Sequence, residues 1–163
     1  MLFRICTAVV ATLSLGACAS TGAVPAPFPV PPSPSLPGPP SSSILSVVAT
    51  ALGLRGVPYR SGGSDPRGFD CSGFVWYVFA QHGLALPRTV SELYAVGERV
   101  GSDDLEPGDL VFFRTEGGGV SHVGMAIGGE EFVHAPNSRG EVRVERMGSD
   151  YWLSRYAGAR RIR

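Results

Sequence analysis

A proline-rich stretch near the N-terminus is the sequence feature that most limits which folds this chain can adopt. Nine of the 14 prolines lie between residues 25 and 40, within the run VPAPFPVPPSPSLPGPP. Proline fixes φ and lacks a backbone N–H, so this stretch favours an extended polyproline II conformation and cannot build a packed core. A globular domain is therefore expected only after it. We predict three parts: residues 1–17, residues 18–43 and residues 44–163.

The first part, residues 1–17, has the pattern of a signal peptide. Arg4 supplies a positive charge, and residues 5–15 form an apolar stretch too short to span a bilayer. The stretch ends in Leu-Gly-Ala-Cys at Cys18, which resembles the lipobox of bacterial lipoproteins. That resemblance implies cleavage before Cys18 and a lipid on its thiol, and Ala19 resembles the sorting pattern for the outer membrane. The alternative is an ordinary signal peptide cut close to the same position.

The second part, residues 18–43, would carry the lipid and act as a spacer. At about 3.1 Å per residue, some 25 residues of polyproline II reach roughly 75 Å. A docking ligand for a proline-binding domain is the other interpretation of this composition. With the lipid on Cys18 as a membrane anchor, we expect the protein in the bacterial cell envelope, on the outer membrane and facing the periplasm.

The charge distribution argues against a nucleic-acid partner. The formal net charge is zero, and all 14 basic residues are arginines. The one basic cluster, Arg160, Arg161 and Arg163, lies at the C-terminus, where we interpret it as a solvated chain end. We expect a monomer.

The domain begins with helical patterns and continues with strand patterns. Apolar spacing predicts a helix that stops at Gly53 or Gly56 and another over residues 70–82, and Pro87-Arg88-Thr89 opens a short third helix. Residues 57–68 are rich in Gly, Ser and Pro and are predicted to be loop. Strands are predicted at 110–114, 121–127, 131–135 and 141–146, and an apolar segment at 151–162 closes the domain. Helices followed by antiparallel strands predict an α+β fold.

One cysteine remains for chemistry. Cys6 leaves with the signal peptide and Cys18 carries the lipid, so Cys71 has no partner for an internal disulfide. With Asp70 as N-cap, Cys71 would be the first residue of its helix, where free amides stabilise a thiolate and could hold an oxyanion. Gly73 would leave room for a substrate backbone. Taken alone, a small half-buried helical cysteine is an equally good interpretation.

A thiol nucleophile needs a base, and the chain has three histidines. His82 lies near the far end of the predicted helix, about 16 Å from the thiol by helical rise, and is interpreted as a surface residue or a cap. His122 opens a predicted strand whose next residues on the same face, Gly124 and Ala126, are small. His134 ends the following strand.

The hairpin register decides whether these two strand histidines can meet. A three-residue loop at 128–130 would put them on one face, with His134 opposite Gly124 and diagonal to His122. A two-residue turn would send them to opposite faces unless a bulge intervened. We predict the shared face, with His122 as the base and His134 orienting it as the third member of a triad. Two half-exposed strand histidines are the alternative.

Four segments in order along the chain resemble a known family. The segments YRSGGSDPRGFDCSGFV, LPRT, LEPGDLVFF and SHVGMAIGGEEFVHAP resemble motifs of the NlpC-type family of bacterial cell-wall cysteine peptidases. The resemblance covers residues 45–162 and implies a minimal papain-like fold, with N-terminal helices packed on a central antiparallel β-sheet. It places the nucleophile at Cys71, the base at His122 and the third polar residue at His134. It also matches Tyr59 to a tyrosine beside the oxyanion site, and Asp70, Ser72 and Ser121 to positions near the substrate's free amine and backbone.

The resemblance implies a peptidoglycan hydrolase. Such a cysteine endopeptidase cleaves the stem peptide, usually between γ-D-glutamate and a diamino acid, and needs no metal or organic cofactor. Two other functions remain open. One is an acyl or amide transferase on the same Cys-His site, in which an amine or lipid replaces water. The other is a non-catalytic wall-binding lipoprotein.

Overall fold

The computed structural model describes residues 40–136 and 140–163, except for the side chains of residues 40–43. The predicted signal peptide, Cys18 and most of the predicted spacer lie outside the described residues. Helix α1 (Pro40–Gly53) begins within the last residues of that spacer and ends at one of the two predicted glycines. Among the described residues, no helix is both long and apolar enough to cross a bilayer.

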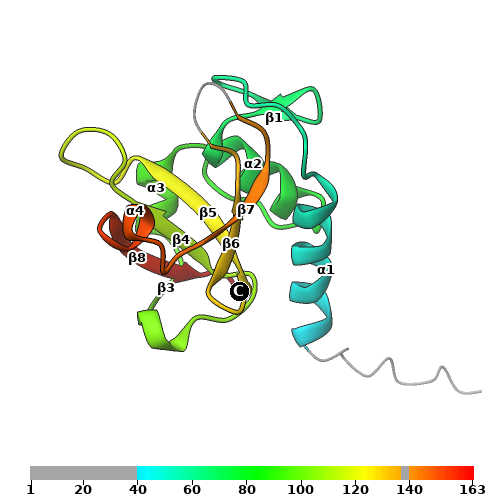
Figure 1. The fold of residues 1–163 in the computed structure, drawn as a ribbon. Helices are drawn as coiled ribbons and strands as arrows, with labels where there is room; N and C mark the ends of the chain where they lie inside the picture. Colours follow the sequence, from blue (N-terminus) through cyan, green and yellow to red (C-terminus); the bar gives the residue numbers. More distant parts are fainter. Residues whose placement is uncertain (1–39, 137–139) are drawn as a thin grey trace, which may run out of the picture. The chain divides into compact units, whose positions relative to one another are not determined.

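A six-stranded antiparallel sheet forms the centre of the domain, in the order β3-β8-β4-β5-β6-β7 (Figure 1). Its strands are β3 (Glu98–Val100), β4 (Leu110–Phe113), β5 (His122–Gly128), β6 (Glu131–His134), β7 (Arg143–Arg146) and β8 (Tyr156–Arg161). The helices after α1 are α2 (Cys71–Ala80), α3 (Val90–Ala95) and the short α4 (Asp150–Leu153). Most of the helical residues precede the antiparallel strands, which confirms the predicted α+β fold.

The sheet buries side chains on both faces. One face, with Phe112, Val123 and Met125, belongs to the main core, together with α1 and α2. The other face, with Phe113 and Phe132 among its residues, packs around Trp152 of α4 in a second cluster that also contains Val111 and Ala126. Because side chains alternate along a strand, neighbouring residues of β4 and β5 serve different cores.

Helix α2 forms where the sequence predicts it and is anchored by its apolar face. Phe74, Val75, Val78 and Phe79 are fully buried. The carboxylate of Asp70 accepts a hydrogen bond from the backbone amide of Gly73 at 2.6 Å, so Asp70 is the N-cap and Cys71 is the first helical residue, as predicted.

Three features of the fold were not predicted. Short strands β1 (Ser64–Asp65) and β2 (Gly68–Phe69) form a small hairpin in the region read as loop. Strand β3 forms at the edge of the sheet. The closing segment divides into α4 and β8, and β8 is inserted between β3 and β4. The last two features depend on pairing between distant parts of the chain, which local patterns do not report.

Candidate active site

Cys71 lies at the N-terminal end of α2, beside the beginning of β5. Its side chain is half-buried, and the backbone amides of Cys71, Ser72 and Val123 are close enough to the sulfur to act on its pKa. Since Val123 directly follows His122 in β5, the last of these contacts places the sulfur next to the strand end that carries His122. The structure thus brings together the helix terminus and the distant strand from which the site was predicted.

The thiol of Cys71 is neutral in the resting protein. Burial, with a smaller contribution from the charge of Asp70, raises its pKa from 9.0 to about 11, although the three amides act in the opposite direction. The amides at the helix end therefore stabilise the thiolate in the predicted direction but do not outweigh burial. The proton on sulfur has to be removed during any nucleophilic reaction.

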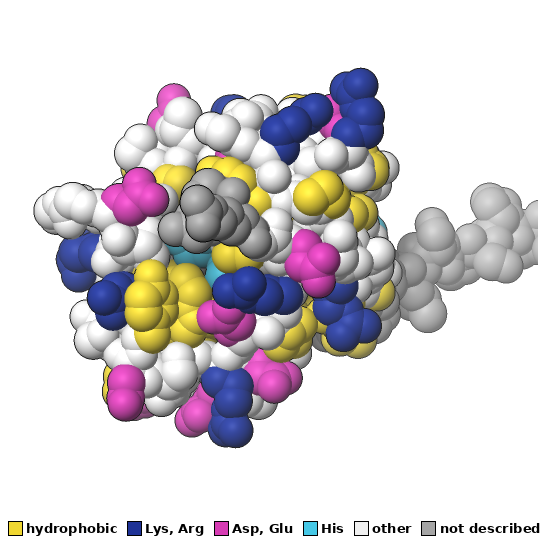
Figure 2. Space-filling view, turned by 45° about the horizontal axis from the view of Figure 1, so that its top comes forward, with side chains coloured by type: hydrophobic (Ala, Val, Ile, Leu, Met, Phe, Trp, Pro, Cys, Tyr) yellow, Lys and Arg dark blue, Asp and Glu magenta, His cyan; other side chains and the backbone are white. Residues whose placement is uncertain are grey.

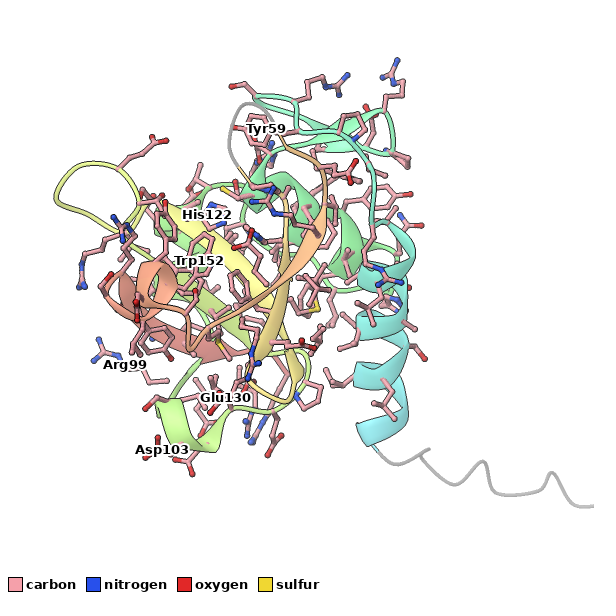
Figure 3. All side chains as sticks on the ribbon, viewed as in Figure 1. Tyr59, Arg99, Asp103, His122, Glu130 and Trp152 are labelled. Carbon is pink, nitrogen blue, oxygen red and sulfur yellow. The ribbon has the colours of Figure 1, made fainter. Side chains whose placement is uncertain are left out.

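His122 and His134 face each other on the same side of the sheet. Nε2 of His122 lies 2.8 Å from Nδ1 of His134, and the two rings are nearly perpendicular, at 89°. Both side chains are buried. Figure 3 shows His122 on β5 against Trp152 of α4, and the two rings stack with their centroids 5.5 Å apart. The predicted shared face is confirmed, and the alternative of two half-exposed histidines is excluded.

The hairpin reaches this register by a different route from the predicted one. The predicted three-residue loop is wrong, because Gly128 pairs with Glu131 and leaves a two-residue turn. A bulge between Ala126 and Gly128 supplies the extra residue, so that Met125 pairs with Val133 and the face is restored. Gly124 then lies opposite His134, where a Cβ would be only 3.1 Å from the histidine's own Cβ.

Burial controls the charge of both histidines. Desolvation lowers the pKa of His122 to about 3, with a further lowering by His134, while Glu145 acts in the opposite direction. Desolvation also lowers the pKa of His134, and its contact with Glu145 again opposes the shift. The resting site thus pairs a neutral thiol with neutral imidazoles.

Glu145 of β7 was not predicted as a site residue. Its Oε1 lies 3.6 Å from Nε2 of His134, which is longer than a hydrogen bond but within reach of an ion pair. The indole N–H of Trp152 donates to its Oε2. The contact with His134 is the main cause that lowers the pKa of Glu145 to about 2, so the carboxylate is ionised. Glu145 and Arg143 lie two residues apart in the strand predicted at 141–146, which is a sequence signal for a polar strand face. The sequence does not show that this strand pairs with β6.

Arg88 of the LPRT segment fixes the start of α2. It donates to both carboxylate oxygens of Asp70, at 2.9 and 2.7 Å, to the hydroxyl of Ser72 at 2.8 Å and to the carbonyl of Gly63 at 3.1 Å. Asp70 and Ser72 are thus hydrogen-bonded within the protein. The expectation that Gly73 leaves room for substrate is wrong, because a Cβ there would meet the Gly63 carbonyl oxygen at 2.0 Å.

The remaining predicted residues fall into two groups. Tyr59 is half-buried, and burial is the main cause that raises its pKa, followed by electrostatic interactions with Cys71 and Asp70. Ser121 accepts hydrogen bonds from the amides of residues 115 and 116, each at 2.9 Å, and so closes the intervening loop. Contact of either residue with substrate stays a prediction. His82 bonds to Thr50 of α1 at 2.9 Å, away from the site.

A pocket of about 310 Å³ opens beside His122. Figure 2 shows histidine side chains in a hollow of this face, next to an apolar patch with basic and acidic groups around it. The aromatic side chain of Tyr151 is 49% exposed at the pocket. The lining residues are Thr115, His122, Pro136, Arg143, Glu145, Ser149, Tyr151 and Trp152. The hollow therefore reaches His122, and both charged and aromatic groups line its walls, whereas Cys71 is not among the lining residues.

The NlpC/P60 family model matches residues 56–161, which include the half-buried cysteine and the paired histidines. The chain belongs to the NlpC/P60 family. This confirms the resemblance predicted from the sequence motifs. Solved NlpC/P60 structures agree with the fold: a family protein from Bacillus cereus ATCC 10987 superposes with a TM-score of 0.69 at 33% identity, covering 72% of this chain and 39% of that one. The NlpC/p60 domain of the peptidoglycan hydrolase SagA gives a TM-score of 0.65 at 33% identity, covering 73% of this chain and 98% of that one.

Curated NlpC/P60 relatives include proteins named as endopeptidases. The murein DD-endopeptidase MepS/murein LD-carboxypeptidase of Escherichia coli (strain K12) is 47% identical over 109 residues, 66% of this chain and 57% of that protein. Murein DD-endopeptidase MepH of the same organism is 43% identical over 112 residues, 66% of this chain and 41% of that protein. The gamma-DL-glutamyl hydrolase of Bacillus subtilis (strain 168) is 41% identical over 120 residues, 71% of this chain and 29% of that protein. The chain thus spans less than two thirds of each of these relatives.

Proposed function

We propose that this NlpC/P60 protein is a peptidoglycan hydrolase, a cysteine endopeptidase that cleaves an amide bond in the stem peptide. The observation that carries the proposal is the packing of α2, which begins at Cys71, against β5, which begins at His122, whose ring is hydrogen-bonded to His134. Nucleophile, base and orienting group thus come from three separate elements. The names of the relatives supply the substrate class.

The first half of the reaction forms an acyl-enzyme. Nδ1 of His122 takes the proton of the Cys71 thiol while the sulfur attacks the scissile carbonyl carbon, because both groups are neutral at rest. The tetrahedral oxyanion lies near the backbone amide of Cys71, with the hydroxyl of Tyr59 as a second donor. His122 then gives its proton to the leaving amine, and the C–N bond breaks.

The second half returns the free enzyme. A water molecule loses a proton to His122 and its oxygen attacks the thioester carbonyl, after which the C–S bond breaks and the proton returns to sulfur. Throughout, the His134 side chain holds the His122 ring through the 2.8 Å contact. No step needs a metal or an organic cofactor.

Two bonds in the stem peptide are candidates for cleavage. The family resemblance favours the bond between γ-D-glutamate and the diamino acid, and the name of the B. subtilis relative also specifies hydrolysis of a γ-glutamyl bond. The names of the two E. coli relatives favour a bond between two D-centres in a cross-link. The first cleavage shortens a stem peptide, whereas the second converts a cross-linked dimer into monomers, so their products differ in mass.

Purified muropeptides provide the test. The wild-type protein should release one of these product sets by mass spectrometry, and Cys71→Ala should leave the mixture unchanged. Products heavier by an added amine or lipid would replace the hydrolase with an acyl transferase. Identical profiles for the wild type and Cys71→Ala would instead support a non-catalytic wall-binding protein.

We also propose that Cys18 is lipidated and anchors a monomer to the outer membrane, facing the periplasm. The Leu-Gly-Ala-Cys pattern and the proline-rich spacer support this. Cys18→Ser should lose incorporation of labelled fatty acid and leave the membrane fraction. Cys6→Ser is the matched control, since that residue precedes the cleavage point, and it should retain both properties. A Cys18→Ser protein that still carries label would refute the anchor.

A further inference from the structure

The buried edge of His134 is the least explained part of the site. Its Nδ1 contacts His122, but its Nε2 is buried and has no hydrogen-bond partner among the described residues. Oε1 of Glu145 lies 3.6 Å from this nitrogen, a distance at which an ion pair forms only if His134 is protonated. A carboxylate directed at a buried imidazole nitrogen costs desolvation energy, so its presence beside the reaction centre calls for a function.

We propose that Glu145 is a positioning residue that sets the tautomers of His134 and His122, so that Nδ1 of His122 is left unprotonated to accept the Cys71 proton. The inference rests on the proposed function, because it assigns a role within the same hydrolytic site. It adds a fourth member to the predicted triad of Cys71, His122 and His134.

The tautomers follow from counting the protons on the two imidazole rings. An ionised carboxylate only accepts hydrogen bonds, so the nitrogen that faces Glu145, Nε2 of His134, has to carry the proton of that ring. A neutral imidazole has one N–H, so Nδ1 of His134 is the acceptor in the 2.8 Å contact. The donor is then Nε2 of His122. That ring's single proton is thereby used, and its Nδ1 keeps a free lone pair.

The carboxylate is held in place on two sides. Strand β7 pairs with β6 so that His134 lies opposite Arg143, which puts Glu145 diagonal to His134 on the same face. The Arg143 guanidinium donates from Nε to one carboxylate oxygen at 2.5 Å, and the indole N–H of Trp152 donates to the other. Trp152 also stacks on the His122 ring, so one side chain orients both the carboxylate and the base.

The charge of Glu145 opposes the other influences on the histidine pair. Burial and Arg143 lower the pKa of His134, whereas Glu145 raises it. Glu145 also raises the pKa of His122 through space, against burial and His134. When His122 takes the thiol proton, the resulting imidazolium is therefore stabilised by the carboxylate, and its orientation is maintained through His134.

The test compares wild-type protein with Glu145→Gln by NMR of ¹⁵N-labelled imidazoles and by pH-rate profiles on muropeptides. In the wild type, both buried rings should carry the proton on Nε2. In Glu145→Gln, His134 should become a mixture of tautomers, and kcat/KM should fall about 10- to 100-fold, as for carboxylates that orient ligand histidines. The acid limb of kcat/KM should move to lower pH, because removing the anion lowers the pKa of His122. KM should change little.

Two further variants keep the inference falsifiable. Glu145→Asp, which retains the charge, should recover part of the activity and the wild-type tautomers. Glu130→Gln makes the same chemical change in the exposed turn between β5 and β6, which Figure 3 shows away from His122, and should match the wild type. The inference is overturned if Glu145→Gln keeps the wild-type tautomers and the wild-type acid limb. It is also overturned if Glu145→Asp, shown by its melting temperature to be folded, recovers neither activity nor the wild-type tautomers. If the wild-type protein did not hydrolyse muropeptides, only the proposed function would be refuted, because NMR measures the tautomers without substrate.

Discussion

At the scale of single residues, the site depends on burial more than on the helix end. The sequence suggested that amides at the start of α2 would make Cys71 a thiolate, and those amides do act to lower the thiol pKa. Burial nevertheless dominates the charge state, because removing water from a thiolate costs more than the amides return. The same desolvation keeps His122 neutral. The resting site therefore holds no separated charges between thiol and base.

This neutral pair predicts a broad pH profile. The free enzyme is active with a neutral Cys71 and a neutral His122, so the acid limb of kcat/KM reports protonation of His122, and the alkaline limb reports ionisation of the thiol. Burial lowers the first pKa and raises the second, so activity should be flat from below pH 6.5 to above pH 9.0. The profile is measured with a muropeptide whose own ionisations have been titrated separately. An acid limb at or above pH 6.5 would contradict the neutral pair.

At the scale of elements, two local devices deliver the reacting groups. The bulged hairpin of β5 and β6 puts both histidines on one face, with Gly124 between them. The Arg88 clamp, by which we mean the hydrogen bonds from Arg88 to Asp70 and Gly63, fixes the first turn of α2 against the loop that contains Gly63. Each device uses close packing of backbone, so each should be sensitive to small changes that leave the helices and strands themselves intact.

The hairpin can be tested at Gly124. A Cβ there would lie 2.6 Å from the Phe132 ring and 3.0 Å from the carbonyl oxygen of Val133, so Gly124→Ala has to displace β6. We expect a loss of about 1–3 kcal/mol in the free energy of unfolding from overpacking, and at least a tenfold fall in kcat as His134 moves. Chemical denaturation and muropeptide assays measure both. Gly119→Ala, with no atom within 4 Å of its Cβ, is the control and should change neither.

The clamp can be tested by changing the shape of its cation. Arg88→Lys keeps the charge but cannot reach Asp70, Ser72 and Gly63 together, because an ammonium lacks the planar fork of guanidinium. We expect a loss of about 1–2 kcal/mol in the free energy of unfolding, since several hydrogen bonds to a carboxylate are weakened. kcat should fall because the start of α2 carries Cys71. Arg99→Lys on exposed β3 serves as the control, and a clamp variant equal to it would argue against this role.

At the scale of the whole domain, the last strand holds the sheet together. Strand β8 lies between β3 and β4, although it is the final element of the chain. Its Arg161 donates to both oxygens of Asp109, at 2.8 Å each, and the Asp109 carboxylate also accepts from the amide of Glu106. Asp109 is 2% exposed. A buried ion pair thus connects the C-terminus to the turn that precedes β4.

Breaking that ion pair should destabilise the whole fold. Asp109→Ala leaves the Arg161 guanidinium without its bidentate partner, and such a loss costs about 3 kcal/mol or more. The expected result is a lower free energy of unfolding in urea with an unchanged m-value, since the same surface is exposed. Asp103→Ala, at an exposed residue that Figure 3 shows at the margin of the domain, should lie within about 0.5 kcal/mol of the wild type. Equal midpoints for the two variants would show that the ion pair contributes nothing.

Much of this protein was readable from local patterns in the sequence. Helical spacing and the Asp70 cap predicted α2 with Cys71 at its first position, and alternation predicted β4, β5 and β6 within a residue or two. These features depend on neighbours in the chain, whose preferences a sequence carries directly. The family motifs also identified which two histidines form the pair.

Other features were decided only by tertiary structure. The bulge after Ala126, the insertion of β8 into the sheet and the contact of Glu145 with His134 all depend on which strands pair and in what register. The charge states of Cys71 and His122 depend on how much water the folded chain excludes. Pairing and desolvation are properties of residues distant in sequence, so no local pattern encodes them.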